Sequence, residues 1–421
     1  MKSRLLILVC CIWALYSVSV SAATTKLVVA EAWGPGPWSG MLDEWKAVFE
    51  SRHPGVEIEF ITLTGSQEDV RAQLLTMLAA DVAPDINMWV WHDIADYFVD
   101  LAPYFERDPE ISLDDFFWTS VEASTLPEGG RTKVFQMPGN PDGQMLWVNL
   151  DALAEAGIAY DPDVPWTWNE FIQNAGRLQR VSGDGQVQRY AATFPFSWPW
   201  AVGPWVWSNE GTILVQNPET GFFDRSEFSN PKTIETLTWL RGLYERNWVG
   251  GDFAQGTSAI VQSWSSTASW QLTFDFNVLP IPVPEAGMPS ITLANGSGLG
   301  GISTQSKNQD VAWEFLKFVA GDEGDCIRMK YMVHIPGVVR SSCVDLWLEK
   351  SNHFRGDVYL TAIQGGHLGP NAKLLGRDGE VTTIAGTEIM RLLNGEISVL
   401  EAVESIDRRV NAIFDEIRAQ R

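Results

Sequence analysis

The most unusual feature of this sequence is a short stretch crowded with tryptophan. FPFSWPWAVGPWVWS, residues 194–208, contains four tryptophans together with three prolines and one glycine. A flat indole ring can either fill a hydrophobic core or lie against the face of a ligand. Because proline and glycine interrupt a regular helix, we interpret the stretch as a loop whose rings line the wall of a cleft. Packing in the core is the alternative for each ring: Trp198, Trp200, Trp205 and Trp207.

Near the N-terminus, predicted strands alternate with predicted helices, and these elements would position further aromatic rings. Apolar runs at residues 26–33, 56–63 and 86–91 predict three strands, and amphipathic segments at 41–53 and 68–83 predict two helices. This alternation predicts a parallel α/β sheet, and such sheets bind ligands beyond the carboxyl ends of their strands. Four tryptophans fall at those ends: Trp33, Trp38, Trp89 and Trp91.

The overall composition limits the number of domains and the class of ligand. A chain of 421 residues exceeds the usual size of a single core, so we expect two domains. The net charge of −23 argues against nucleic acid and against anionic lipid headgroups as partners. The sequence contains no histidine–cysteine spacing typical of a metal site, no phosphate-binding loop and no nucleophile elbow. We therefore expect neither a metal nor a cofactor.

The first 22 residues predict an export signal. Lys2 and Arg4 form a basic start, an apolar run follows, and the small residues of VSA end at Ala22. We expect cleavage after Ala22 or Ala23 and a periplasmic mature protein. An uncleaved membrane anchor is the alternative.

Two cysteines, Cys326 and Cys343, remain after removal of the signal. An even pair in an oxidising compartment suggests one disulfide. Two free buried thiols are the alternative.

Five sequence motifs follow one another over nearly the whole mature chain. They are QLLTMLAADVAPDI (73–86), LWVNLDALAEAGI (146–158), PWTWNEFI (165–172), GLGGISTQSKNQDVAWEFLKFVAG (298–321) and LLNGEISVLEAV (392–403). In this order, behind an export signal, they resemble family 1 extracellular solute-binding proteins, the sugar-binding receptors of ATP-binding-cassette importers. Within that family, the sequence most resembles receptors for maltose, trehalose and other oligosaccharides.

The resemblance implies the two-lobed periplasmic-binding-protein fold of type II, an α/β fold with the ligand cleft between the lobes. It implies that the chain crosses between the lobes three times, and we expect these crossings near residues 138–143, 286–296 and 335–341, each rich in proline or glycine. The expected N-terminal lobe then comprises residues 24–138 plus 292–336, and the C-terminal lobe comprises 142–288 plus 340–421.

The resemblance also implies which residues contact the sugar. By its place after a strand, Trp264 is expected to stack on the sugar, with Trp270 as the alternative. The family usually has a Gly-Lys pair before this strand, whereas here Gly256 lacks the lysine. Gly300 and Gly301 resemble the glycines that let the backbone approach the sugar, because glycine has no side chain; a hinge turn is the alternative.

Polar contacts are expected from side chains near strand ends and crossings. A sugar offers many hydroxyls, so its site needs carboxylates, amides or cations beside the aromatic rings. The alternative for these polar residues is a structural role without ligand contact; Asp142, for example, could cap a turn. The candidates are Glu31, Gln67, Asp142, Gln144 and Arg340, with His92, Asp93 and His334 as weaker ones.

The function that follows from the resemblance is binding without catalysis. The protein would act as a monomer, capture a sugar or oligosaccharide by closure of the lobes and deliver it to the permease subunits of an importer. One alternative is a secreted carbohydrate-active enzyme, since export and abundant tryptophan fit that class too. A second is the same fold binding a polyol or another non-sugar.

Overall fold

The computed structural model describes residues 24–32, 37–128, 130–331, 335–339, 341–350, 354–370, 373–375 and 377–420. The expected signal peptide (1–22) lies outside these residues. So do three candidate site residues, Trp33, His334 and Arg340.

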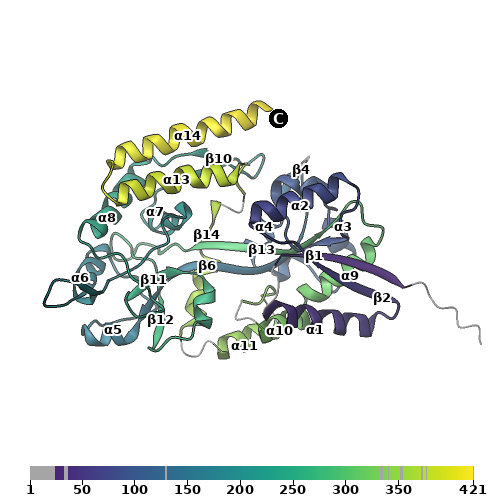
Figure 1. The fold of residues 1–421 in the computed structure, drawn as a ribbon, viewed down its shortest axis with the longest axis horizontal. Helices are drawn as coiled ribbons and strands as arrows, with labels where there is room; N and C mark the ends of the chain where they lie inside the picture. The colour runs from purple at the N-terminus through teal and green to yellow at the C-terminus, as the bar shows by residue number, and fades with distance from the viewer. Residues whose placement is uncertain are drawn as a thin grey trace, which may run out of the picture.

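The first half of the molecule is built on the predicted parallel strands. Strand β1 (Thr25–Glu31) pairs in parallel with β2 (Val56–Thr62) over its whole length and with β3 (Ile86–Asn87). Helices α1 (Pro37–Arg52) and α2 (Gln67–Ala79) lie on opposite sides of these strands (Figure 1). Their apolar faces bury alternate strand residues in two separate clusters, because successive side chains of a strand point to opposite faces.

Two details of this half differ from the expectation. Strand β3 ends at Asn87, so Trp89 and Trp91 follow the strand instead of belonging to it. Trp38 lies in the first turn of α1, because Pro37 begins that helix instead of preceding it as a loop residue.

Two long strands connect the halves of the molecule (Figure 1). They are β6 (Met137–Asn149) and β13 (Leu293–Ile302), which pair antiparallel at the centre of an eight-stranded sheet. Met137, at the start of β6, packs in the core beside α1, whereas Val148, near its end, packs in the core of the other half. Strand β13 runs the opposite way, from Leu293 in the second core to Ile302 in the first.

The first expected crossing, near residues 138–143, contains two prolines, and β6 runs through them unbroken. Its partner strand accommodates them, because the register shifts between Gly296 and Gly298 and again between Gly298 and Gly300. Irregularities of this kind allow proline within a strand pair.

The second half surrounds the other ends of these two strands. Strands β11 (Ile260–Ser263) and β12 (Phe276–Leu279) pair antiparallel with β6. Helix α6 (Trp168–Leu178) begins with a capping box of Thr167 and Glu170. Helix α14 (Val399–Gln420) packs beside α13 (Asp378–Leu393) (Figure 1).

The predicted disulfide between Cys326 and Cys343 is present, with its Cα atoms 5.4 Å apart. It joins α10 (Asp322–Tyr331) to α11 (Ser342–Lys350), next to a third apolar cluster around Trp147 and Trp347.

The remaining helices are α3 (Ala102–Arg107), α4 (Trp118–Ala123), α5 (Leu150–Glu155), α7 (Gly203–Trp207), α8 (Pro231–Glu245), α9 (Gln309–Ala320) and α12 (Gly356–Gln364). The remaining strands are β4 (Thr125–Glu128), β5 (Arg131–Val134), β7 (Arg180–Val181), β8 (Val187–Arg189), β9 (Leu214–Gln216), β10 (Phe223–Ser226) and β14 (His367–Leu368). Short 3-10 helices are η1 (His92–Tyr97), η2 (Leu113–Asp115), η3 (Pro199–Val202) and η4 (Ser265–Ser269).

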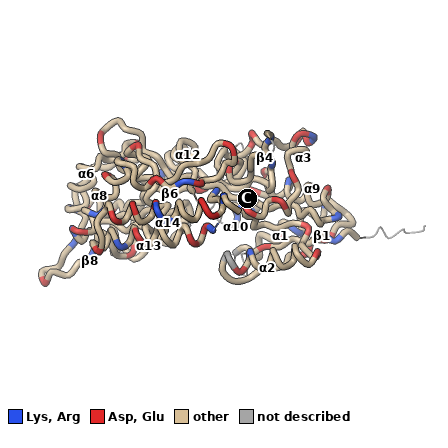
Figure 2. Tube along the Cα trace, turned by 90° about the horizontal axis from the view of Figure 1, so that it is seen from above, with Lys and Arg blue, Asp and Glu red and all other residues tan. Residues whose placement is uncertain are grey.

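Charged residues of both signs are spread over both halves (Figure 2), consistent with an acidic chain that holds many surface ion pairs. None of the helices in the described ranges has the length and apolarity needed to cross a membrane.

Candidate ligand-binding site

Much of the tryptophan-rich stretch 194–208 is helical where we expected a loop. It forms η3 (Pro199–Val202) followed directly by α7 (Gly203–Trp207). Pro199 and Pro204 occupy the first turns of these helices, where the missing N–H has no helical acceptor and costs nothing. The prolines therefore begin helices here instead of breaking one.

Two rings of the stretch belong to the core. Trp200 and Trp205 are both fully buried. Trp205 Nε1 donates to Gln262 Oε1 at 2.8 Å, and Gln262 Nε2 donates in turn to Gln144 Oε1 at 2.9 Å. Gln144, expected to contact a ligand, is thus buried and bonded to a neighbouring strand. Gln262 was not among the predicted site residues, although a polar residue among the apolar residues of strand 260–263 was a usable signal.

The other two rings of the stretch are half-buried and reach residues far away in the sequence. The Trp198 ring lies 5.6 Å from the Trp264 ring at an interplanar angle of 60°. Trp198 precedes η3 and Trp264 precedes η4, so both rings stand where a short helix begins. Trp207 packs beside His367, with 5.3 Å between ring centres. The structure therefore brings two predicted candidates, Trp198 and Trp264, together.

Asp142 fixes the segment that carries Trp264. Its Oδ1 atom accepts the Ser265 N–H at 3.0 Å and lies 3.2 Å from the Tyr359 hydroxyl, which also donates to the Gly143 carbonyl oxygen. Burial, together with the negative charge of Asp142, raises the pKa of Tyr359 well above its usual value, so this hydroxyl keeps its proton. Asp142 thus orients the start of η4 from the middle of β6. Nothing in the sequence pattern pointed to Tyr359, because its role depends on contacts with distant residues.

The first half of the molecule offers a second pair of rings. Trp89 and Trp91 are half-buried, with ring centres 6.4 Å apart at an angle of 60°. Trp38 is also half-buried. Glu31, at the end of β1, is buried and accepts a hydrogen bond from the Thr62 hydroxyl. The remaining candidate of this half, Gln67, is the first residue of α2.

The weaker candidates His92 and Asp93 have partners within the protein. Asp93 forms an ion pair with Arg71. The His92 ring lies 5.0 Å from Phe135 of the first half and 6.4 Å from Phe222 of the second. Burial, with a smaller effect of the Lys373 charge, lowers the pKa of His92 to about 3, so its ring is neutral at physiological pH.

A further ion pair lies near His92. Lys373 is buried, and its Nζ atom contacts Glu122 Oε2 at 2.6 Å. The two halves therefore touch here through side chains as well as through the long strands.

The glycine pair approaches its own protein closely. A Cβ atom on Gly300 would lie 2.8 Å from the Asn87 carbonyl oxygen, and Gly300 has a φ of +138°. A Cβ atom on Gly301 would lie 2.7 Å from the Phe135 carbonyl oxygen. Both positions therefore require glycine for the packing of β13, independently of any ligand.

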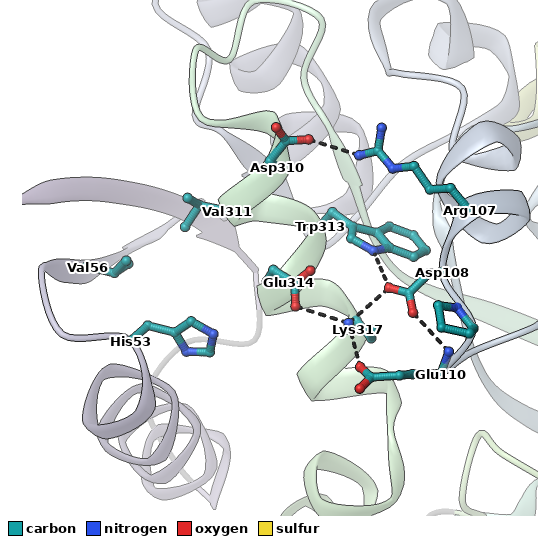
Figure 3. Close-up of a pocket in the computed structure, with 11 residues that line it drawn as sticks. His53, Val56, Arg107, Asp108, Glu110, Asp310, Val311, Trp313, Glu314 and Lys317 are labelled. Carbon is teal, nitrogen blue, oxygen red and sulfur yellow. Dashed lines mark hydrogen bonds and ion pairs between the residues drawn. The ribbon is translucent and has the colours of Figure 1, made fainter.

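A cavity of about 730 Å³ lies elsewhere in the first half, between α9 and the segments that follow α1 and α3 (Figure 3). Its charged side chains bond to one another. Lys317 Nζ contacts Asp108 at 2.9 Å, Glu110 at 2.8 Å and Glu314 at 3.1 Å, and Arg107 contacts Asp310 at 2.9 Å. Because these groups satisfy each other, and none of the predicted site residues lines the cavity, we do not assign it to the ligand.

A sequence profile described as bacterial extracellular solute-binding protein matches residues 32–325, which is more than half of the chain. The chain belongs to this family. This solute-binding protein is 30% identical over 177 residues to an uncharacterized lipoprotein from the oleD 5′ region of Streptomyces antibioticus. That match covers 40% of this chain and only 35% of the relative.

Solved structures share the fold of this solute-binding protein over nearly its whole length. The sugar-binding protein MalE of Xanthomonas citri is 19% identical, with a TM-score of 0.76 over 94% of this chain and 98% of MalE. UgpB of Mycobacterium tuberculosis, in complex with glycerophosphocholine, is 18% identical, with a TM-score of 0.74 over 94% of this chain and 99% of UgpB. The likeness confirms the predicted two-lobed α/β fold.

Proposed function

We propose that this solute-binding protein captures a sugar or oligosaccharide between its lobes and delivers it to the membrane subunits of an ATP-binding-cassette importer. The observation that carries the proposal is the pair of half-buried rings, Trp198 and Trp264, beside the Asp142 carboxylate. The family is one of binding proteins, and we propose that this member has no catalytic activity.

The proposed lobes are residues 24–138 plus 292–336 and residues 142–288 plus 340–421. The course of β6 and β13 supports the first two boundaries, because each strand begins in one hydrophobic core and ends in the other. The proposed ligand cleft lies between the lobes, with Trp89 and Trp91 on one wall and Trp198 and Trp264 on the other.

The chemistry of these residues suits a polyhydroxylated, uncharged ligand. An indole face that covers the C–H face of a sugar contributes about 1–2 kcal/mol through apolar burial, and each neutral hydrogen bond adds about 1 kcal/mol. Two stacked rings with several hydrogen bonds therefore reach roughly micromolar affinity. Further proposed contacts come from Trp33, Trp38, Glu31, Gln67 and Arg340.

The test is a carbohydrate panel read by tryptophan emission and by product analysis in the same samples. Maltose, trehalose and xylo-oligosaccharides are expected to change the emission of half-buried indoles without turnover. UgpB binds a glycerophosphodiester on this fold, so glycerophosphocholine and a polyol belong in the panel. Hydrolysis of any sugar would replace the proposal by the enzyme alternative. A response to glycerophosphocholine or the polyol alone would reassign the ligand class.

We further propose that the chain is exported, loses residues 1–22 and works as a monomer outside the cytoplasm. The mass of the mature protein tests the removal of residues 1–22, because an intact leader would contradict it.

A further inference from the structure

Segments at or next to the three proposed crossings between the lobes meet at one group of polar side chains. Asn140 lies in β6, Ser297 in β13 and Arg328 in α10. Asn140 Oδ1 accepts the Ser297 hydroxyl at 3.1 Å and Arg328 Nη1 at 3.3 Å. One amide oxygen thus joins both long strands to α10. We call Asn140, Ser297, Asp325 and Arg328 the crossing cluster.

Asp325 extends this cluster to the third crossing. It forms an ion pair with Arg328, and the two side chains are only 0% and 3% exposed. Asp325 Oδ2 also accepts the backbone N–H groups of Gly337 at 2.8 Å and Val338 at 3.1 Å. A buried ion pair is costly to leave incomplete, so the positions of all its partners are tightly held.

The backbones of the three crossings are also in direct contact. A Cβ atom added to Gly139 would lie 2.9 Å from the Ser297 carbonyl oxygen. One added to Gly337 would lie 3.0 Å from the Gly139 carbonyl oxygen. A side chain at either position would force the segments apart, so close packing of the crossings depends on these two glycines.

The disulfide fastens the third crossing covalently to the same helix. Cys326 follows Asp325 in α10, and its partner Cys343 lies in α11, beyond the crossing. Asp322, also in α10, accepts the Ser342 N–H at 2.7 Å. The described part of the crossing, residues 335–339, therefore lies within a short covalent loop that is hydrogen-bonded to α10.

We propose that the disulfide and the crossing cluster form a clamp that makes the three crossings move as one unit and restricts the lobes to a narrow range of openings. The inference rests on the proposed function only in that the lobes open and close. Removing the disulfide releases a loop that was closed at both ends, and the freed segment gains conformations. The lobes of the ligand-free protein should then sample a wider range of openings, because a less ordered segment connects them.

The experiment uses ligand-free mature protein, so it does not depend on which solute binds. Dyes attached through non-cysteine chemistry at the exposed positions 57 and 238, one in each proposed lobe, report the distance between the lobes in single molecules. In the Cys326→Ser, Cys343→Ser double variant the distance distribution is expected to broaden about twofold. Ser297→Ala, which leaves the disulfide intact, is expected to broaden it less. An unchanged distribution in both variants would overturn the clamp.

Hydrogen exchange separates the clamp from a merely stabilising disulfide. In the double variant the amides of Gly337 and Val338 are expected to exchange at least about tenfold faster, while amides of β1 keep their rate, because the opening is local. A uniform acceleration throughout the chain would contradict the proposal. Ser51→Ala is the control for Ser297→Ala, because Ser51 is an exposed serine with one hydrogen bond outside the crossings.

Discussion

Trp205 and Trp264 are the same residue type and pack in or against the same hydrophobic cluster, yet they are buried to different extents. Trp205 is fully buried, and its N–H donates to Gln262. Trp264 is half-buried and packs against another half-buried ring, Trp198. The difference teaches that local density of tryptophan does not define a binding surface. What defines it is which rings keep a face free of the core, and this is decided by the backbone that carries them.

The largest expected effect comes from truncating the buried ring. Trp205→Ala should lower the free energy of unfolding by about 3–5 kcal/mol, because it leaves a cavity and deprives Gln262 of a buried partner. Denaturant unfolding measures the loss. Trp198→Ala, in the same stretch, is the matched control and should cost less than half as much. Equal losses would break the distinction between core rings and surface rings.

Burial affects a titratable side chain, His92, as well as the tryptophan rings. Its pKa is lowered to about 3 in the folded protein, while in the unfolded chain it is near 6.5. Between these values the unfolded state binds the extra proton. The folded protein therefore loses stability as pH falls from 6.5 toward 3, by up to about 1.4 kcal/mol per pH unit. Unfolding of the wild type and of His92→Gln at several pH values measures this contribution, and identical pH profiles would contradict it.

The proposed ligand ring should affect binding and spare the fold. Trp264→Ala is expected to weaken sugar affinity about tenfold, or about 1.4 kcal/mol, with a small change in unfolding. Trp270→Ala is the matched control, since that ring lies six positions on and is 36% exposed. Titration calorimetry with the best sugar from the panel compares the two. An effect of Trp270 alone would transfer the stacking role to that ring.

The smallest expected effect tests how the Trp264 segment is held. Tyr359→Phe removes the hydroxyl that contacts Asp142 and the Gly143 carbonyl oxygen, and it should lower stability by about 1 kcal/mol. Sugar affinity should fall a few fold, because η4 loses part of its anchor. Tyr97→Phe, at an exposed position, should change neither quantity. Wild-type affinity in Tyr359→Phe would mean that η4 is held without this contact.

Local pattern predicted those parts of the fold whose residues decide their own conformation. The apolar run at 56–63 and the amphipathic segments at 41–53 and 68–83 were sufficient for β2, α1 and α2. The course of β6 through Pro138 and Pro141 was not predictable in this way, because a distant glycine-rich strand accommodates the prolines.

The candidate site shows the same limit. Trp198 and Trp264 could be named from the sequence, and their contact could not, since it joins segments 66 residues apart in the chain. Gln144 and Trp205 were expected at the ligand, whereas the structure encloses both. Burial of Trp205 and partial exposure of Trp207 depend on which side of α7 faces the core, which proline content alone does not specify.

The antiparallel pair of β6 and β13 has a consequence for dividing the protein. Each proposed lobe takes part of its sheet from the same two strands, so a gene fragment that encodes one lobe alone would leave backbone N–H and C=O groups of a long strand unpaired. Such open edges recruit other chains and promote aggregation. The two lobes are thus expected to be inseparable as soluble fragments.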